Sequence, residues 1–257
     1  GKFKRYSLRA NSDIKVGERL KFGESLQLQR TTRNEANDGM YLVYKSALNS
    51  PHVPYFDANG PGGYAVVNNA STGGAGFQNW FAFNDNRYQY TDKEVYKVFG
   101  NFYAEVDIIK GLKFRSSYGV EFMDYTGGEL RGDFNISTQE GSLPSAGLAY
   151  SDVNSLSATF NNIITYETSF GKHDIKLLAG HEETNYNQDQ LGVNAVNLTN
   201  RGVLLASTAQ SANVGDDKNH WAIRGFLGRL NYSFDGKYYL TANLRQDSSS
   251  RFSSENR

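Results

Sequence analysis

The segment Val98–Asp124, which reads VFGNFYAEVDIIKGLKFRSSYGVEFMD, indicates the fold of this chain. On either side of Lys110-Gly111, apolar residues alternate with polar ones. Successive side chains of a β-strand point to opposite faces of a sheet, so each half is predicted to be a strand with one apolar and one charged face. The tight Lys-Gly break between the halves predicts an antiparallel hairpin.

The same pattern repeats in three more hairpins, whose predicted turns lie near residues 17, 171 and 236. Between the hairpins, three long segments are rich in Gly, Asn, Ser and Asp, approximately residues 32–93, 127–153 and 190–219. We therefore predict an all-β, antiparallel meander of about eight strands, each about 12 to 16 residues long. Helix is expected only as a turn or two within the loops.

The charged face of these strands indicates their surroundings. Such a face would be unfavourable in the core of a small soluble protein, but it is ordinary inside a wide, water-filled barrel whose apolar face meets lipid. Outer-membrane barrels also combine short periplasmic turns with long extracellular loops, which compact soluble domains seldom carry. The residues expected to face lipid are Phe102, Ala104, Val106, Phe114, Tyr118, Val120, Phe160 and Ile164. Those expected to face the lumen are Glu105, Asp107, Arg115 and Glu121.

Composition agrees with this prediction and excludes other classes of protein. The chain has 27 basic and 27 acidic residues, whereas a nucleic-acid partner would require a basic surplus. It has no cysteine, which excludes disulfides and thiolate metal sites. Aromatic residues make up 14%, as suits strands and the aromatic girdles of membrane barrels. Mean hydropathy is −0.59, and no apolar run approaches the roughly 18 residues of a membrane helix.

The 257 residues are expected to form an incomplete segment of a barrel. Eight strands can close a barrel, but its lumen is only just wide enough for side chains to fill it. Several charged residues per strand are predicted to point inward, so a larger barrel is favoured. The chain opens directly into a strand pattern, without a secretory signal, and its last residues form a polar segment without a return strand.

The last hairpin carries a family resemblance. Gly225–Phe234, followed by Tyr238–Phe252, resembles the signature hairpin of the SusC/RagA family, TonB-dependent outer-membrane transporters of Bacteroidetes. This family usually shows Arg-Arg-Asp-Gly-Ser-Ser-Arg-Phe here, and this chain departs from it at Gln246 and Ser248. The Val98–Arg115 hairpin and the Ser50–Tyr55 loop motif are also similar to family segments.

The resemblance implies a 22-stranded barrel with an N-terminal plug, capped by a SusD-like surface lipoprotein. It implies import of oligosaccharides or peptides, energised through TonB, in the bacterial outer membrane. Residues 1–257 would then be an internal barrel segment that lacks the plug and the C-terminal strands. TonB would act through the missing N-terminal part, and the expected partners are lipid, lipoprotein and substrate.

Aromatic residues of the first long segment are candidates for substrate or partner binding. They are accompanied by amide and charged groups, which suits stacking on sugar rings or on an extended peptide. The alternative is that they pack against the barrel rim or the lipoprotein. The candidate residues are Tyr55, Phe56, Tyr64, Trp80, Phe81 and Arg87.

Other motifs do not indicate catalysis, and no enzyme activity, cofactor or metal is expected. The four histidines, His52, His173, His181 and His220, belong to separate predicted elements. Gly73–Gly76 lacks the strand-helix context and the Lys-Ser/Thr of a phosphate-binding loop, so a flexible loop tip is favoured.

Three functions therefore remain. The first is the SusC/RagA-type importer. The second is another outer-membrane barrel, such as a diffusion porin or an adhesin scaffold. The third is a soluble β-rich carbohydrate-binding protein, which would have shorter strands and a buried apolar face.

Overall fold

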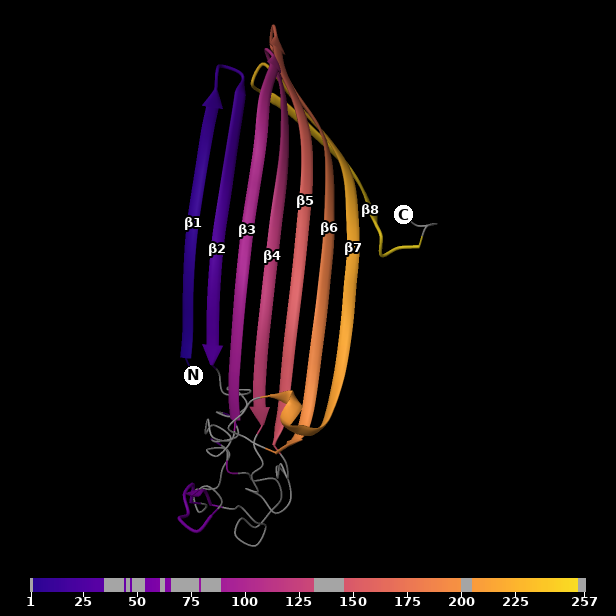
Figure 1. Cartoon of the computed structure of the whole chain (residues 1–257). Coiled ribbons are helices and arrows are strands. Elements are labelled where there is room, and N and C mark those ends of the chain that lie inside the picture. The colour runs from indigo at the N-terminus through magenta and orange to yellow at the C-terminus, as the bar shows by residue number, and fades with distance from the viewer. Residues whose placement is uncertain are drawn as a thin grey trace.

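The described residues form an eight-stranded antiparallel meander, as expected (Figure 1). The computed structural model describes residues 2–34, 44, 47, 54–60, 63–65, 79, 89–131, 146–199 and 205–253. Each strand pairs with the strands next to it in sequence, and every pairing is antiparallel. The strands are β1 (Lys2–Val16), β2 (Leu20–Asn34), β3 (Gln89–Ile109), β4 (Leu112–Arg131), β5 (Gly147–Phe170), β6 (His173–Leu198), β7 (Ala209–Phe234) and β8 (Tyr238–Ser249). A 3-10 turn, η2 (Ala206–Thr208), precedes β7.

The four short turns lie where the sequence predicts them. Gly17, Gly111, Gly171 and Gly236 have φ values of 64°, 82°, 58° and 62°. Only glycine adopts this left-handed conformation without steric cost, so it is the favoured residue at these turns. All four turns lie at one end of the sheet, and β2, β4 and β6 end at the opposite end (Figure 1).

β1, β2 and β8 have the expected length, with 15, 15 and 12 residues, but β3 to β7 are longer than expected. The predicted limits of the long segments are wrong. β3 to β7 contain 20 to 26 residues each. The ladder between β6 and β7 continues to the pair Leu198–Ala209, inside the segment predicted as a loop at residues 190–219. On β6 apolar residues still alternate there, at Leu191, Val193 and Ala195. The paired part of β7 carries Asp216 and Lys218 on the same face, so the backbone ladder continues without a uniformly apolar face.

The pairing register places the predicted lipid-facing and lumen-facing sets on opposite faces of the sheet. Residues directly opposite each other on neighbouring strands share a face. Phe102 pairs with Tyr118, which pairs with Phe160, and these three residues form an apolar row. Val106, Phe114 and Ile164 form a second apolar row. Glu105 pairs with Arg115, and Asp107 with Lys113, on the face that we call the polar face. We call the other face the apolar face.

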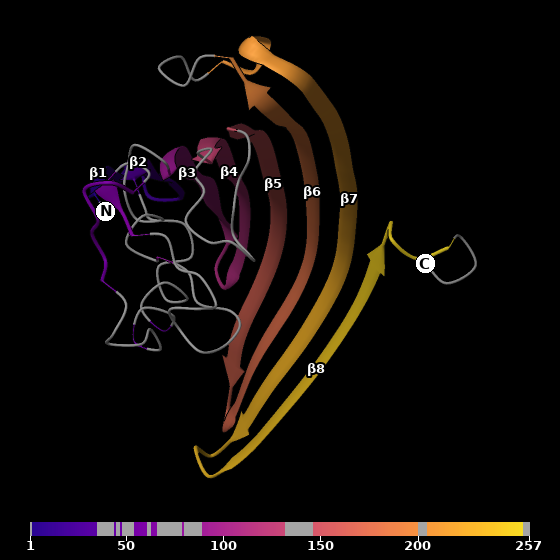
Figure 2. The ribbon, with the colours of Figure 1, turned by 90° about the horizontal axis from the view of Figure 1, so that it is seen from below.

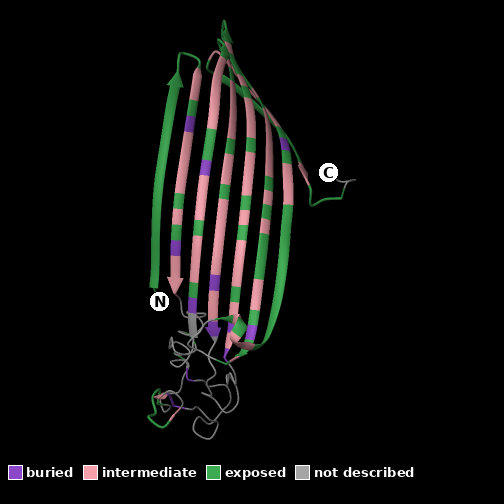
Figure 3. Cartoon of the chain, in the orientation of Figure 1, coloured by how far each residue is buried: buried purple, intermediate pink, exposed green. Residues whose placement is uncertain are grey.

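The sheet curves like part of a barrel wall (Figure 2), and the described residues include no second layer that covers it. Few strand residues are buried (Figure 3). Thr91, Leu130, Leu148 and Ala195 belong to the loop-end parts of their strands, and the buried residues nearer the turns are glycines, Gly23, Gly100 and Gly225. Large apolar side chains elsewhere are open, with Leu8 at 66% and Phe102 at 49% exposure. A sandwich would cover such a face with a second sheet, so the soluble alternative does not match this fold.

No helix in the described part of the chain is both long enough and apolar enough to cross a membrane.

Candidate functional site

The structure brings together three of the six predicted loop residues. Phe56 and Tyr64 form an isolated antiparallel bridge, and their ring centroids lie 5.6 Å apart at an interplanar angle of 31°. Tyr55 precedes this bridge and accepts a hydrogen bond from the Ala65 N–H at its carbonyl (3.2 Å). The other three predicted residues, Trp80, Phe81 and Arg87, lie outside the described residues.

Backbone hydrogen bonds close Tyr55–Ala65 into a small hairpin. The Asp57 N–H donates to the Gly63 carbonyl (3.1 Å), and the Gly63 N–H donates to the Gly60 carbonyl (3.0 Å). A Cβ atom at Gly60 would lie 1.9 Å from the Tyr64 carbonyl oxygen, so the tight turn requires glycine. The hairpin lies beyond the loop ends of the strands (Figure 1).

Asn79 fixes this hairpin from a distant position in the sequence. Its side-chain amide donates to the carbonyls of Tyr55 (2.7 Å) and Ala65 (3.0 Å), and the residue is only 1% exposed. Tyr64 is buried, whereas Phe56 is 66% exposed and Tyr55 is 36% exposed. Tyr64 and Asn79 therefore support the hairpin, and Phe56 is the aromatic ring most open to a ligand. The sequence marks Asn79 only by its place among the aromatic residues.

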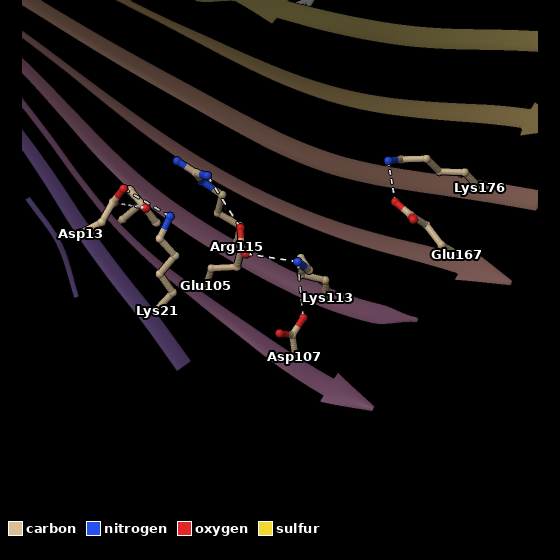
Figure 4. Close-up of polar contacts among 9 residues, drawn as sticks. Asp13, Lys21, Glu105, Asp107, Lys113, Arg115, Glu167 and Lys176 are labelled. Atoms are coloured by element: carbon tan, nitrogen blue, oxygen red, sulfur yellow. Dashed lines mark hydrogen bonds and ion pairs between the residues drawn. The ribbon is translucent and has the colours of Figure 1, made fainter. Parts of the chain in front are cut away.

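The polar face carries a ladder of ion pairs in its turn-end half (Figure 4). Lys113 lies 3.3 Å from Glu105 and 3.5 Å from Asp107, and Arg115 lies 3.7 Å from Glu105. These groups are partly exposed, so each pair contributes little to stability, about 0 to 1 kcal/mol. The ladder instead makes this face compatible with water, as a barrel lumen requires.

Tyr103 connects this ladder to β1. Its hydroxyl donates to Asp13, which also pairs with Lys21 (3.3 Å). The guanidinium of Arg115 lies 3.8 Å from the centre of the Tyr103 ring. The ring crosses Gly23, where an added Cβ would lie 2.2 Å from a ring carbon. Glycine at this position allows the side chains of four strands, β1 to β4, to meet.

A pocket of about 430 Å³ lies on the polar face beyond the ladder. Arg9, Gln27, Phe99 and Glu121 belong to one register row across β1 to β4, and all four line it. A ring, a cation, an amide and a carboxylate at one pocket can contact a peptide or a sugar. Glu121 therefore lies on the face predicted for it. The sequence alone could not group these residues, because grouping requires the register.

The residues that carry the family resemblance hold the end of β8 on the wall. The Ser250 N–H donates to the Ala222 carbonyl (2.9 Å), and the Ala222 N–H donates to Ser250 Oγ (2.8 Å). Arg251 lies over the ring of Trp221 (5.2 Å), which stacks on Tyr186 with centroids 5.1 Å apart. These contacts indicate a structural role for the segment that follows β8.

The histidines of the described chain contact neighbouring polar or aromatic groups. His173 Nδ1 lies 2.7 Å from the Tyr232 hydroxyl, and His220 Nδ1 lies 2.8 Å from Asn187 Oδ1. His181 packs on Phe226. His52 lies outside the described residues. Within the described ranges, no three His, Cys, Asp or Glu side chains are grouped to hold a metal ion.

Comparison with known proteins identifies related chains, although no family model matches. TonB-dependent receptor P3 of Formosa agariphila is 23% identical over 264 residues, and TonB-dependent receptor P26 of the same organism is 24% identical over 269 residues. Each match covers 98% of this chain and 25% of the receptor. The chain thus spans about a quarter of the length of these curated relatives.

Solved structures show the same architecture. The RagAB peptide importer in its 'closed-closed' state matches with a TM-score of 0.73 and 23% identity, over 99% of this chain and 29% of that chain. The 'open-open' state gives the same TM-score, with 28% of that chain covered.

The expected resemblance is confirmed by both the curated relatives and the fold. In a barrel of this kind the apolar face meets lipid, and the polar face lines the lumen. Over nearly its whole length the chain is similar to a segment of the outer-membrane β-barrel of SusC/RagA-type TonB-dependent transporters.

Proposed function

We propose that the intact protein is an active importer of oligosaccharides or peptides, energised through TonB and working with a SusD-like lipoprotein. The observation that carries this proposal is the near-complete coverage of the chain by TonB-dependent receptors. The lumen wall supports it, because the ion-pair ladder and the polar pocket suit the passage of a hydrophilic substrate. RagAB, whose fold this chain shares, is a peptide importer, which supports peptides as one substrate class.

Dependence on TonB separates this proposal from a diffusion porin. Uptake of labelled oligopeptides and oligosaccharides would be measured in cells that carry the full-length protein, with and without TonB. An importer loses uptake of its substrate without TonB, whereas a porin retains it. Retained uptake would contradict the proposal and favour the porin alternative. An adhesin would show uptake in neither strain.

We also propose that the first long loop contacts substrate or lipoprotein. Phe56 is the most exposed described aromatic residue of the predicted site, and the Tyr55–Ala65 hairpin that contains it lies beyond the wall. Phe56→Ala should reduce uptake or recovery of the lipoprotein in a pull-down, because an aromatic ring supplies much of a ligand's contact area. Trp80→Ala, at another predicted residue of this loop, should do the same.

Two further variants separate loop contacts from loop folding. Deletion of residues 60–76 should leave the barrel assembled, since it removes no hydrogen bond between the strands. It should reduce uptake or lipoprotein binding. Asn79→Ala removes both bonds that fix the Tyr55–Ala65 hairpin and should act in the same direction. If all four variants show normal uptake and normal lipoprotein binding, this loop has no part in the mechanism.

A further inference from the structure

Two arginines lie on the apolar face, where charged residues are unexpected. Arg30 of β2 pairs with Glu94 of β3, with Nε 2.5 Å from Oε1. Arg224 of β7 pairs with Glu183 of β6 at 3.2 Å. The register confirms the face, because Arg30 pairs with Tyr96 across the β2–β3 ladder and Glu183 belongs to the row of Phe160.

Both arginines lie at the same depth. Arg30 is about ten residues from Leu20, the turn end of β2, and Arg224 is about ten residues from Phe234, the turn end of β7. A tilted strand crosses the apolar core of a bilayer in about 9 to 11 residues. Each arginine therefore lies where its strand leaves the hydrocarbon on the extracellular side. This position explains why Arg224 breaks the alternation of its hairpin.

A groove distinguishes Arg30 from Arg224. The groove has a volume of about 410 Å³ and follows β2 between β1 and β3, where Tyr6, Leu8, Leu28, Tyr96 and Val98 line it together with Arg30. From Arg30 toward the turn, the apolar face of β2 continues with Leu28, Leu26 and Glu24. The Ser12 hydroxyl donates a hydrogen bond to Glu24 (3.1 Å). The groove thus combines an apolar floor with a cation at its extracellular end.

The guanidinium of Arg30 is held by one ion pair and keeps hydrogen-bond donors for a further ligand. Glu94 engages only its Nε, and the group lies over the Tyr96 ring at 5.4 Å. The two Nη groups have no partner among the described residues, and the side chain is 52% exposed. Lys4, which is exposed on the same face, pairs with Thr32, two residues beyond Arg30 on β2. Lys4 thus belongs to the same row as Glu94, and Arg30 presents a planar fork that suits a phosphate.

We propose that this groove binds a phosphate-bearing lipid of the outer leaflet. One acyl chain lies along Leu8, Leu28 and Val98, and the lipid phosphate accepts hydrogen bonds from Arg30 Nη and contacts Lys4. Aromatic side chains at the headgroup level, here Tyr6 and Tyr96, are typical of this boundary. The proposal depends on the membrane position of the wall and not on transport, so it stands apart from the proposed function.

The test measures lipid retained by the intact protein. The protein is purified from outer membranes in mild detergent, and bound phospholipid per barrel is counted by native mass spectrometry. We expect Arg30→Gln to lower the retained lipid about tenfold, because hydrogen bonds to charged groups are strong. Arg224→Gln is the matched control, because it removes a paired arginine at the same depth outside the groove, and it should retain lipid like the wild type. The shift in gel mobility on heating verifies that each barrel is folded.

Further probes identify the ligand. A diacyl phosphatidylglycerol should compete for the groove, whereas diacylglycerol, which lacks phosphate, and inorganic phosphate, which lacks acyl chains, should not. Leu28→Trp should fill the groove and lower retention while Arg30 is still present. The proposal is overturned if the wild type retains no lipid, if Arg30→Gln and Arg224→Gln behave alike, or if either partial ligand competes as well as phosphatidylglycerol.

Discussion

The Glu105–Arg115 pair and the Val106–Phe114 pair are neighbours on β3 and β4, yet they belong to different environments. The first pair joins an ion-pair ladder on the lumen wall, and the second belongs to an apolar row that ends at Ile164. The backbone geometry of the two pairs is the same. The two faces of one hydrogen-bonded strand pair thus meet lipid and water. Successive side chains point to opposite faces, so a residue's position in this period of two determines which of the two it contacts.

The environment of a side chain depends on its depth in the membrane as much as on its face. On the apolar face, the rows of Phe102 and Val106 are largely apolar on β3 to β5, but the ion pairs of Arg30 and Arg224 lie about ten residues from the turns. Two properties of a residue, its face and its distance from the turn, are therefore needed to predict what surrounds its side chain. The predictions that follow test each property in the intact protein.

The largest contrast is expected in labelling by a membrane-impermeant thiol reagent. Tyr118 is 47% exposed on the apolar face, near the middle of the membrane, and Ser117 is its neighbour on the polar face. In the intact protein without other accessible thiols, Ser117→Cys should react and Tyr118→Cys should not, because the reagent requires water. Labelling would be measured by mass spectrometry on intact cells. The opposite result would show that the faces are reversed.

A charge at the membrane centre should have the next largest effect. Ile164 lies on the apolar face about six residues from the turn end of β5, near the middle of the crossing. Ile164→Arg should destabilise the barrel by about 2 to 4 kcal/mol, whereas Val106→Arg, close to the inner boundary, should cost about 0 to 1 kcal/mol. Thr165→Arg, on the polar face opposite Lys113, should cost less than about 1 kcal/mol. Urea unfolding in phospholipid vesicles measures all three. Equal costs at residues 164 and 165 would refute the face assignment.

An intermediate effect is expected where the polar face is closely packed. Gly23→Val places a side chain where the Tyr103 ring reaches Asp13 and should cost about 1 to 3 kcal/mol. Gly215→Val, on the same face of β7, meets nothing within 4 Å and serves as the control. The free energy of unfolding of both variants is compared with the wild type. A similar cost at both glycines would mean that strand glycines matter here only for the backbone.

Much of the wall could be predicted from the sequence, because it depends on local rules. The hairpin at Gly111 and the opposite faces of Phe102 and Glu105 follow from turn chemistry and from period two. The ends of β6 and β7 were not predicted, because the alternation of Leu191, Val193 and Ala195 on β6 faces a polar stretch of β7. The charge of Arg224 on the apolar face is explained by its depth, which the period of two does not indicate.

The candidate site was less predictable, since its contacts join residues far apart in the sequence. Aromatic density indicated Tyr55, Phe56 and Tyr64, but it did not show that Tyr64 is buried or that Asn79 fixes the hairpin. The polar pocket joins Arg9 to Glu121 through three strand registers. Each register depends on pairings that a single sequence does not display.

The smallest effect is expected from an ion pair on the wet face. Arg245 Nη2 lies 3.0 Å from Glu182, and Arg245 also binds Asp247 on its own strand at 2.9 Å. All three side chains are partly exposed, at 35% to 47%, so water screens their attraction. A double-mutant cycle with Arg245→Gln and Glu182→Gln should give a coupling energy of about 0.2 to 1 kcal/mol.

The same cycle distinguishes the polar face from a dry interior. Unfolding would be measured at low and at high salt, and the coupling should weaken with salt because exposed charges are screened. A coupling well above this range that does not respond to salt would mean that the pair is dry in the intact barrel. The polar face at Arg245 would then be packed against another part of the protein. It would differ in this from the water-exposed ion pairs around Glu105.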